Sequence, residues 1–347
     1  MEIVLKNLFS VAKYLAGAVV VLVLAFIPAA AQAPVTAEGG TRIEVRAQQI
    51  EAFNPREISQ SRFGELEFRG GLILTSPYRH FGGISSIRVS SDGGGLIAVS
   101  DKGYWLRARI AYRAGKPIGI TDAEMAPILG ADGRPLNRRG WYDTESLAED
   151  GGTLYVGIER VNQIVRFDYA KDGLAARGVP IALPPGVRML PSNKGLECLV
   201  VPPKGQPLAG TLIAISERGL DALGNNLGFL IGGATAGTFT VKRSDDFDVT
   251  DCATTPRGDL LILERRFSWA IGVAMRIRRL ALSQVKPGAL LDGPELIFAD
   301  MGFQIDNMEG LAVHRAATGE LVLTLISDDN FSPIQRNILL QFTLVGE

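Results

Sequence analysis

A pattern of two short apolar strands recurs five times in this 347-residue chain. Each copy holds a first apolar run, a glycine-containing turn, a second apolar run and a closing acid, and four of the five copies also open on an acid. The opening positions 85, 145, 197, 251 and 309 are separated by 60, 52, 54 and 58 residues. A repeat of this kind dictates both the architecture and the place where the acidic side chains collect.

A second pair of strand-like runs lies between consecutive copies, for example residues 163–168 with 179–183. One period therefore holds about four short strands, which is the content of one β-propeller blade. No long segment after residue 40 shows the periodicity of an amphipathic helix. The sequence predicts an all-β fold, a single β-propeller of five or six four-stranded blades. A β-sandwich and two unrelated β-domains are the alternatives.

The two ends of the propeller domain are expected to complete one blade together. Residues 337–344 have the pattern of the third strand of the last blade, and residues 64–75 that of its outer strand. Pairing them would close the ring and remove unpaired strand edges. A sixth, degenerate blade near residues 42–53 is left open. The predicted domains are a signal peptide at 1–31, an N-terminal extension at 32–63 and the propeller at 64–347.

The N-terminal segment has the features of a secretory signal peptide. Lys6 and Lys13 precede an apolar run over residues 14–27, and three alanines at 29–31 offer a cleavage site. An uncleaved membrane anchor is the competing interpretation, because the run approaches the length of a membrane span. We expect a periplasmic or secreted protein with no stable membrane insertion after cleavage. The formal net charge of −1 gives no support for nucleic-acid binding, and we expect a monomer.

Hairpin geometry predicts where the repeated acids meet. In an antiparallel hairpin the start of the first strand lies beside the end of the second, so the opening and closing acids share one end. If the hairpins form the inner halves of the blades, both sets surround one mouth of the central channel. The expected first tier is Glu145, Glu197, Asp251 and Glu309. The expected second tier is Asp101, Glu159, Glu217, Glu264 and Asp328.

Crowded carboxylates repel one another unless cations, basic side chains or raised pKa values relieve the repulsion. An all-oxygen cluster favours Ca²⁺, whereas acids mixed with arginine favour a phosphorylated or carboxylated ligand. A structural role, in which the acids bind backbone amides of the next blade, is the alternative for any single acid. The predicted metal ligands are Glu145, Glu197, Asp251, Glu309, Asp101, Glu159, Glu217 and Asp328.

The segments before and after the repeats supply further candidates at the same mouth. Arg139, Lys194 and Arg218 could hold an anionic substrate, and Trp141 could form an aromatic wall. His80 precedes the first repeat and could act as a general base, although a structural histidine fits as well. His80 and His314 are the only histidines in the chain, which leaves little material for a Ser-His-Asp triad.

The two cysteines, Cys198 and Cys252, both follow an opening acid, and export would place them in an oxidising compartment. In equivalent positions of successive blades they should point in the same rotational sense, so they should not face each other. We therefore expect buried free thiols rather than a disulfide.

Several motifs resemble a known family. They are Phe81-Gly82-Gly83-Ile84-Ser85, Trp141-Tyr142-Asp143-Thr144-Glu145-Ser146, Asn193-Lys194-Gly195-Leu196-Glu197, Asn307-Met308-Glu309-Gly310-Leu311 and Ser327-Asp328-Asp329-Asn330-Phe331. In order and spacing they resemble the phytase-like family of exported bacterial proteins, described by an "esterase-like activity of phytase". The resemblance implies hydrolysis of phosphate or carboxylic esters and Ca²⁺ in an acidic channel. The scarcity of histidine departs from histidine-phosphatase chemistry and favours a metal-activated water as the nucleophile.

Two classes of function remain open. In the first, a metal-dependent ester hydrolase would use Glu145, Glu197 and Glu309 with His80 as catalytic residues, and its ligand would be a small anionic ester. In the second, a non-catalytic propeller would bind a small ligand, an envelope polymer or a protein. A quinone-dependent oxidation is a weaker third class, because the chain shows no recognisable cofactor motif.

Overall fold

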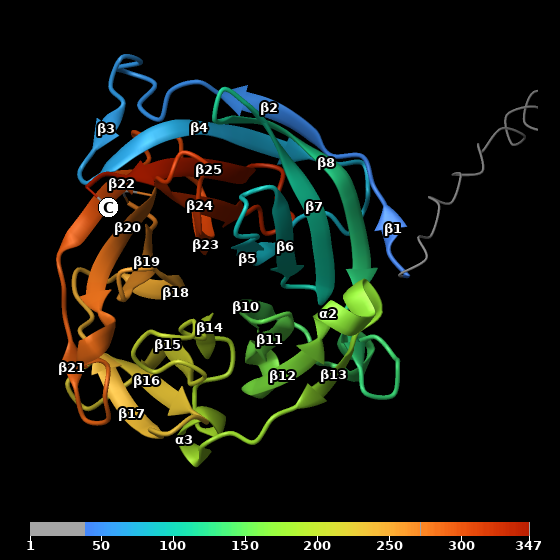
Figure 1. Cartoon of the computed structure of the whole chain (residues 1–347), viewed down its shortest axis with the longest axis vertical. Helices are drawn as coiled ribbons and strands as arrows, with labels where there is room; N and C mark the ends of the chain where they lie inside the picture. The colour runs from blue at the N-terminus through green and yellow to red at the C-terminus, as the bar shows by residue number, and fades with distance from the viewer. Residues whose placement is uncertain (1–38, 271, 347) are drawn as a thin grey trace, which may run out of the picture. The chain divides into compact units, whose positions relative to one another are not determined.

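Five sheets surround a common centre in the computed structural model, which describes residues 39–270 and 272–346 (Figure 1). Blade 1 contains β5 (Ile84–Val89), β6 (Gly95–Ser100), β7 (Tyr104–Arg113), β8 (Lys116–Pro127) and the edge strand β1 (Thr41–Arg42). Blade 2 contains β10 (Thr144–Asp150), β11 (Thr153–Ile158), β12 (Gln163–Asp168), β13 (Arg177–Pro180) and β9 (Leu129–Gly130). The predicted signal peptide lies outside the described residues.

The remaining blades follow the same order from the centre outward. Blade 3 contains β14 (Leu196–Val200), β15 (Leu212–Leu220), β16 (Asn226–Ile231), β17 (Gly237–Val241) and β21 (Leu290–Leu291). Blade 4 contains β18 (Asp248–Thr254), β19 (Asp259–Ser268), β20 (Gly272–Ala281) and β22 (Glu295–Asp300). Blade 5 contains β23 (Asn307–Arg315), β24 (Leu321–Asp328), β25 (Asn337–Leu344), β4 (Leu66–Thr75) and β2 (Arg46–Ile50), with β3 (Arg62–Phe63) beside β4. The predicted propeller is confirmed, with five blades.

Strand β4 from the N-terminal part of the chain meets the C-terminal strand β25 in blade 5, as predicted. Strand β25 pairs with β4 in antiparallel register from Asn337 opposite Leu74 to Leu344 opposite Leu66. The segment proposed as a sixth blade instead supplies β1 to blade 1 and β2 to blade 5. The ring is therefore closed by strands from both ends rather than by an additional blade.

The inner strand of every blade carries a β-bulge at the same place. One residue is skipped in the pairing of each inner strand with the second strand of its blade. The skipped residues are Ser85, Glu145, Glu197, Thr250 and Glu309. A bulge re-aims the extra side chain and bends the strand, so these five residues point differently from their neighbours.

Hydrophobic residues fill the spaces between neighbouring blades, and the alternation of side chains along each strand explains why. The residue two positions after each bulge is buried against the preceding blade, as Leu147 is between blades 1 and 2 and Leu199 is between blades 2 and 3. The residue directly after the bulge faces the following blade, as shown by Ser146, whose hydroxyl donates to the carbonyl of Leu196 at 2.9 Å.

Cys198 and Cys252 form a disulfide between the inner strands of blades 3 and 4, with their Cα atoms 5.2 Å apart. The expectation of free thiols was wrong because it gave both cysteines the same phase. Cys198 directly follows the bulge at Glu197, whereas Cys252 lies two residues after the bulge at Thr250. Consecutive residues face opposite sides of a strand, so the two sulfur atoms meet in the space between the blades.

The centre of the ring is closed by a buried ion pair. The guanidinium of Arg88 donates to both carboxylate oxygens of Asp251, at 3.0 and 3.1 Å, and to the carbonyls of Leu199 and Leu311. Asp251 is fully buried and also accepts from the hydroxyl of Ser86. The pair therefore joins the inner strands of blades 1, 3, 4 and 5, and we call it the central ion pair.

Removing the disulfide should lower the free energy of unfolding. We expect the Cys198→Ala/Cys252→Ala variant to lose about 3 kcal/mol, because the closed loop restricts the unfolded chain. Urea unfolding of the wild type and the variant, each with and without a thiol reductant, measures the difference. The reductant should destabilise only the wild type; a wild-type midpoint that does not respond to reduction contradicts the disulfide.

Breaking the central ion pair should be more costly than replacing it. We expect Arg88→Met to destabilise the fold by about 3 to 5 kcal/mol, because it leaves the Asp251 carboxylate buried without its cation. The double variant Arg88→Met/Asp251→Asn should recover part of that loss, since no uncompensated charge remains. Urea unfolding of the single and double variants provides the measurement, and strictly additive losses would show that the two residues do not depend on each other.

Candidate functional site

Seven of the bulge and strand-end positions carry carboxylates, and these surround one mouth of the ring. The bulges contribute Glu145, Glu197 and Glu309. On the second strand, the residue before each bulge pairs with Ser100, Ile158, Ser216, Glu264 or Ser327, and the next residue along is Asp101, Glu159, Glu217, Arg265 or Asp328, in blades 1 to 5 respectively. We call the seven acids and Arg265 the acidic mouth.

Blade 4 corrects two of the predicted positions. The bulge residue is Thr250 rather than Asp251, and the strand-end residue is Arg265 rather than Glu264. Asp251 belongs to the central ion pair, so its oxygens are already bound by Arg88, Ser86 and backbone N–H groups. We therefore leave Asp251 out of the candidate metal site.

The carboxylate of Glu264 is likewise already paired, here with two arginines of strand β20. Its carboxylate is fully buried and accepts hydrogen bonds at 2.7 Å from Arg276 and Arg278. In blade 4 the alignment predicted from the sequence was shifted by one residue. Asp251 directly follows the bulge position and Glu264 directly precedes the strand-end position, so each acid was taken for the equivalent residue.

Three acids of blades 2 and 3 form the tightest group of the mouth. Glu159, Glu197 and Glu217 each offer one carboxylate oxygen, and these atoms lie within 4.8 Å of one another. All three side chains are buried. Among the described residues, Oε2 of Glu197 is buried without a hydrogen-bond partner. Three converging carboxylates with an unsatisfied oxygen are a donor set that suits a hard divalent cation.

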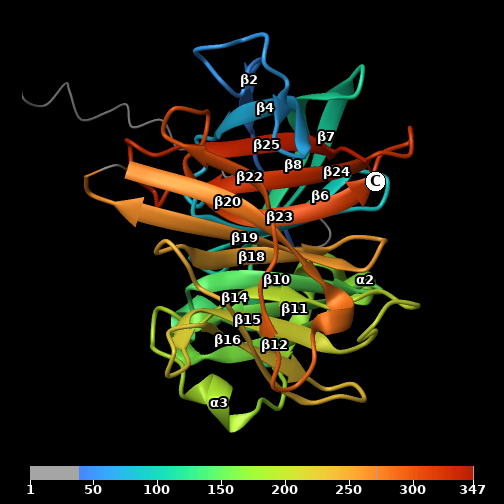
Figure 2. The ribbon, with the colours of Figure 1, turned by 90° about the vertical axis from the view of Figure 1, so that its left-hand side faces the viewer.

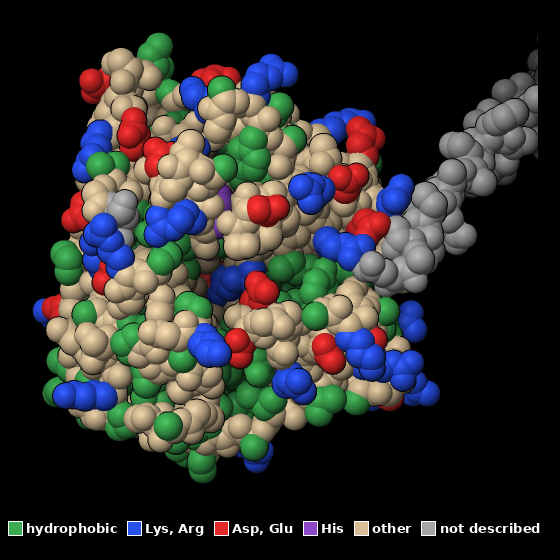
Figure 3. All heavy atoms as spheres, in the orientation of Figure 1, with side chains coloured by type: hydrophobic (Ala, Val, Ile, Leu, Met, Phe, Trp, Pro, Cys, Tyr) green, Lys and Arg blue, Asp and Glu red, His purple; other side chains and the backbone are tan. Residues whose placement is uncertain are grey.

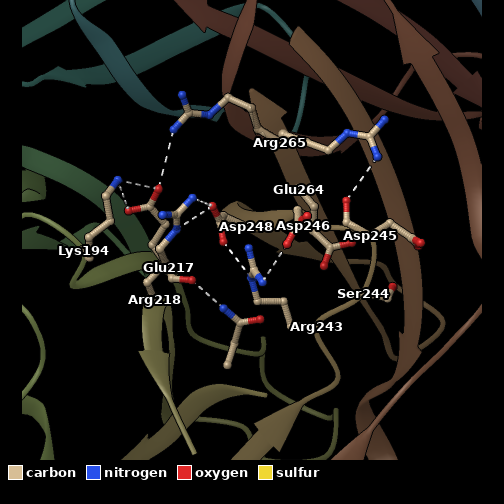
Figure 4. Close-up of polar contacts among 12 residues, drawn as sticks. Lys194, Glu217, Arg218, Arg243, Ser244, Asp245, Asp246, Asp248, Glu264 and Arg265 are labelled. Carbon is tan, nitrogen blue, oxygen red and sulfur yellow. Dashed lines mark hydrogen bonds and ion pairs between the residues drawn. The ribbon is translucent and has the colours of Figure 1, made fainter. Parts of the chain in front are cut away.

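Two basic residues approach the same group, and Figure 4 shows Glu217 between them. The ammonium of Lys194 lies 2.9 and 2.7 Å from the two oxygens of Glu217. The guanidinium of Arg265 lies 3.7 Å from Glu217 and 3.4 Å from Glu309. Lys194 was predicted from the sequence, whereas Arg265 was missed as a member of the mouth.

Glu309 lies between the guanidinium of Arg265 and the side-chain amide of Asn307. Its Oε1 accepts a hydrogen bond at 2.8 Å from the amide of Asn307, whose own oxygen accepts from Arg265. Burial raises the pKa of Glu309 to about 8, and the Arg265 charge opposes this increase. Glu309 is therefore mostly protonated at neutral pH.

The other acids of the mouth also hold protons more tightly than free carboxyl groups. Burial raises the pKa of Glu145 and of Glu197 well above 4.5, and repulsion from Glu309 and Glu145 respectively adds to it. Burial raises the pKa of Asp101 and of Glu159 to about 7, and that of Asp328 to about 6. The mouth thus carries fewer negative charges at neutral pH than its residues could supply.

His80 lies in a separate aromatic environment. Its ring stacks on Tyr104 at 4.3 Å between centroids, and its Nε2 accepts from the Nε of Arg79 at 2.9 Å. Burial lowers the pKa of His80, and the charges of Arg79 and Lys102 lower it further. A neutral imidazole fits a base, but the contacts seen are those of a structural histidine.

The side chains of the other predicted binding residues are engaged by partners outside the acidic mouth. Arg218 donates to Asp248 at 2.6 and 2.8 Å, and Arg139 forms an ion pair with Asp132. Trp141 packs against the hydrophobic residues between blades 1 and 2. Of the predicted substrate-binding residues, Lys194 is the one that contacts an acid of the mouth.

Cavities lie at the opposite end of the ring. A cavity of about 620 Å³ lies between blades 1 and 2, and its lining includes Arg88, Arg107, Glu124 and Tyr169. Tyr169 begins the short helix α2 (Tyr169–Asp172), which lies at the front in Figure 1. Figure 3 shows this end hollowed at its centre, with basic and acidic side chains at the opening.

The sequence matches the phytase-like family, described as "esterase-like activity of phytase", over residues 79–331. This match covers most of the chain and every inner strand of the propeller, so the chain belongs to the phytase-like family. No curated protein matches the sequence.

Solved structures of low sequence identity share a general similarity with the chain. Glutaminyl cyclase from Myxococcus xanthus aligns with 88% of this chain and 98% of its own, at 11% identity and a TM-score of 0.41. The N-terminal domain of Nup159 aligns with 82% of this chain and 96% of its own, at 8% identity and a TM-score of 0.37. A chain of a nidogen/laminin complex aligns with 76% of this chain and 86% of its own, at 10% identity and a TM-score of 0.38. None of the helices in residues 39–346 has the length and apolar character needed to cross a bilayer.

The raised pKa values predict that the metal-free protein loses stability as the pH rises. The folded state keeps protons on Glu309 up to about pH 8 and on Glu159 up to about pH 7, whereas a free glutamate releases its proton near 4.5. Between these limits the folded state binds more protons than the unfolded chain, so stability decreases with pH. Thermal unfolding in a chelator at pH 5.5 and pH 8.5 should give the lower melting temperature at pH 8.5.

Glu309→Gln should flatten this dependence, because glutamine does not titrate. A metal-free melting temperature that rises between these two pH values would contradict the charge distribution described for the mouth.

Proposed function

We propose that this protein is a metal-dependent hydrolase of phosphate or carboxylic esters, acting at the acidic mouth of the propeller. Membership of the phytase-like family supports a hydrolase. The observation that carries the proposal is the buried group formed by Glu159, Glu197 and Glu217, in which Oε2 of Glu197 has no hydrogen-bond partner.

The donor set favours a divalent cation bound by oxygen, and Ca²⁺ in particular, because calcium accepts several carboxylates in flexible geometry. Glu159, Glu197 and Glu217 would hold it, with Glu145 and Glu309 from the neighbouring bulges within the same ring. When bound, such a cation polarises the ester and lowers the pKa of a coordinated water. The ammonium of Lys194 contacts both oxygens of Glu217, so it would compete with a cation for this carboxylate.

The basic residues of the mouth are suited to an anionic substrate. Arg265 presents its guanidinium between Glu217 and Glu309, and the ammonium of Lys194 lies on the other side of Glu217. Guanidinium and ammonium groups bind phosphate and carboxylate oxygens through charge-assisted hydrogen bonds. We propose that Arg265 and Lys194 orient the anionic end of the ester.

Glu309 is suited to donate a proton to the leaving group. Its pKa of about 8 keeps the carboxyl protonated at neutral pH. An alkoxide leaving group needs a proton as the ester bond breaks, and a nearby neutral carboxyl group can supply it. Glu145 has the same character, because its pKa is also raised by burial and by Glu309.

The disulfide supports export of the protein. Disulfides persist in oxidising compartments and are rare in the cytosol. The Cys198–Cys252 bond therefore agrees with the signal peptide expected at residues 1–31, and we propose a periplasmic or secreted location.

A non-catalytic binding protein is the second candidate. It is favoured by blade 4, whose acids Asp248 and Glu264 are fully paired with arginines, and by the exposed aromatic side chain of Trp269. In that case the cation would stabilise the fold, and esters would not be hydrolysed.

Glu197→Gln should abolish cation binding at the mouth. In the wild type, Ca²⁺ added after chelation should raise the melting temperature, because a ligand bound only by the folded state stabilises it. The rise should be larger at pH 8.5 than at pH 5.5, since the acids must lose their protons to bind the cation. Differential scanning calorimetry with Ca²⁺, Mg²⁺, Mn²⁺ and Zn²⁺ provides the measurement.

Glu149→Gln is a matched control, because Glu149 is an exposed glutamate that lines the cavity at the opposite end. This control should keep the full cation response. Hydrolysis of p-nitrophenyl phosphate and p-nitrophenyl acetate, with and without the stabilising cation, then separates the two candidates. Stabilisation without hydrolysis would favour the binding protein, and an unchanged cation response in Glu197→Gln would refute the proposed ligands.

A further inference from the structure

Exposed apolar side chains collect in the loops at the end of the ring that carries the acidic mouth. These loops join the second to the third strand of a blade, or the outer strand to the inner strand of the next blade. The most exposed are Trp269 at 96%, Ile334 at 88%, Leu223 at 86% and Met189 at 79%. Single exposed apolar side chains are ordinary on a protein surface, whereas several gathered at one end of a molecule mark an interaction site.

Three of these residues occupy equivalent places in consecutive blades. Leu223 lies between β15 and β16, Trp269 between β19 and β20, and Ile334 between β24 and β25. We call these three connections the tip loops. In Figure 2 the β19–β20 hairpin ends at the left of the ring, whereas α2 lies at the right. The tip loops of blades 3, 4 and 5 therefore project at one end, and it is the end that holds the acidic mouth.

The tip of blade 4 is the most apolar of the three. The rings of Phe267 and Trp269 meet edge to face at 5.1 Å, and Phe267 is 54% exposed. Met301, 57% exposed, approaches the hairpin closely enough that a Cβ on Gly272 would meet its side chain at 2.8 Å. A tryptophan with its ring in water beside a phenylalanine is typical of side chains that enter the headgroup region of a bilayer.

Basic residues accompany the apolar ones at this end. Arg160, Arg188 and Arg266 each stand directly before an exposed apolar residue, namely Val161, Met189 and Phe267. The guanidinium of Arg266 stacks on Phe247 at 4.8 Å, and that of Arg160 lies over Tyr142 at 5.3 Å. Alternating apolar and cationic side chains complement a surface that is apolar beneath and anionic on top.

We propose that the tip loops dock the protein on an anionic lipid bilayer, with the acidic mouth facing the membrane surface. Separate apolar side chains on three hairpins can each enter a deformable headgroup layer. A folded protein partner would need a well-packed interface core of complementary shape, which three separate loop tips do not provide. The inference does not depend on hydrolysis, but it would present esters at a lipid surface to the acidic mouth.

Binding to vesicles of phosphatidylcholine with phosphatidylglycerol tests the proposal on the exported, processed protein. Trp269 reports contact directly, because Trp105 is fully buried and Trp141 is partly buried. We expect the emission of the wild type to shift to shorter wavelength on adding these vesicles, with little shift on vesicles of phosphatidylcholine alone. Trp269→Phe should retain binding in a flotation assay and lose the shift.

The variant Leu223→Ser/Trp269→Ser/Ile334→Ser should reduce the vesicle partition coefficient by about tenfold or more, because three apolar side chains no longer leave water. Ile58→Ser/Val179→Ser/Leu290→Ser is the matched control, since these three residues are also exposed but lie outside the tip loops. The control should bind as the wild type does.

Equal partitioning of both triple variants, or no binding of the wild type to either kind of vesicle, would overturn the docking proposal. Glu197→Gln should bind vesicles normally, so a failed hydrolase and a failed membrane contact give different results. Loss of vesicle binding in Glu197→Gln would also count against the tip loops as the contact.

Discussion

The central ion pair allows the acidic mouth to exist. Arg88 reaches the inner strands of three other blades, and its guanidinium forms an ion pair with the buried carboxylate of Asp251. The charge of Arg88 is therefore paired within the ring and does not balance the carboxylates at the mouth. A ring held together by hydrophobic contacts alone could splay its inner strands to separate like charges. The ion pair ties them, so the acids stay buried and close together, and their burial, with the repulsion added to it, appears as raised pKa values.

The sequence was sufficient to predict the architecture because the repeat is long and regular. Alternating apolar residues, turns and closing acids define each hairpin, and the pairing of residues 66–75 with 337–344 follows from the need to cover edges. What could not be predicted is the phase within blade 4. A bulge adds one residue to a strand without changing the apolar pattern, so Thr250-Asp251 and Glu264-Arg265 can each be aligned in two ways.

That single-residue ambiguity affected three conclusions at once. It assigned Asp251 to the mouth, omitted Arg265 from it and separated Cys198 from Cys252. Ser100, Ser216 and Ser327 precede the closing acids of blades 1, 3 and 5, but neither Leu263 nor Glu264 is a serine, so this pattern does not fix the alignment of blade 4. The partners of His80 and Arg139 depend on loop conformations that no repeat constrains.

Closure by both ends has a consequence for how the chain reaches its folded state. Arg69 and Thr343 are joined by a hydrogen bond although 274 positions separate them in the sequence. Four blades consist almost entirely of local hairpins and can form as the chain emerges, whereas blade 5 must wait for its last strand. Until β25 has been synthesised, one edge of β4 has no partner strand. Among the strand edges of the nascent protein, this edge therefore stays unpaired for the longest time and is the most open to pairing with another chain.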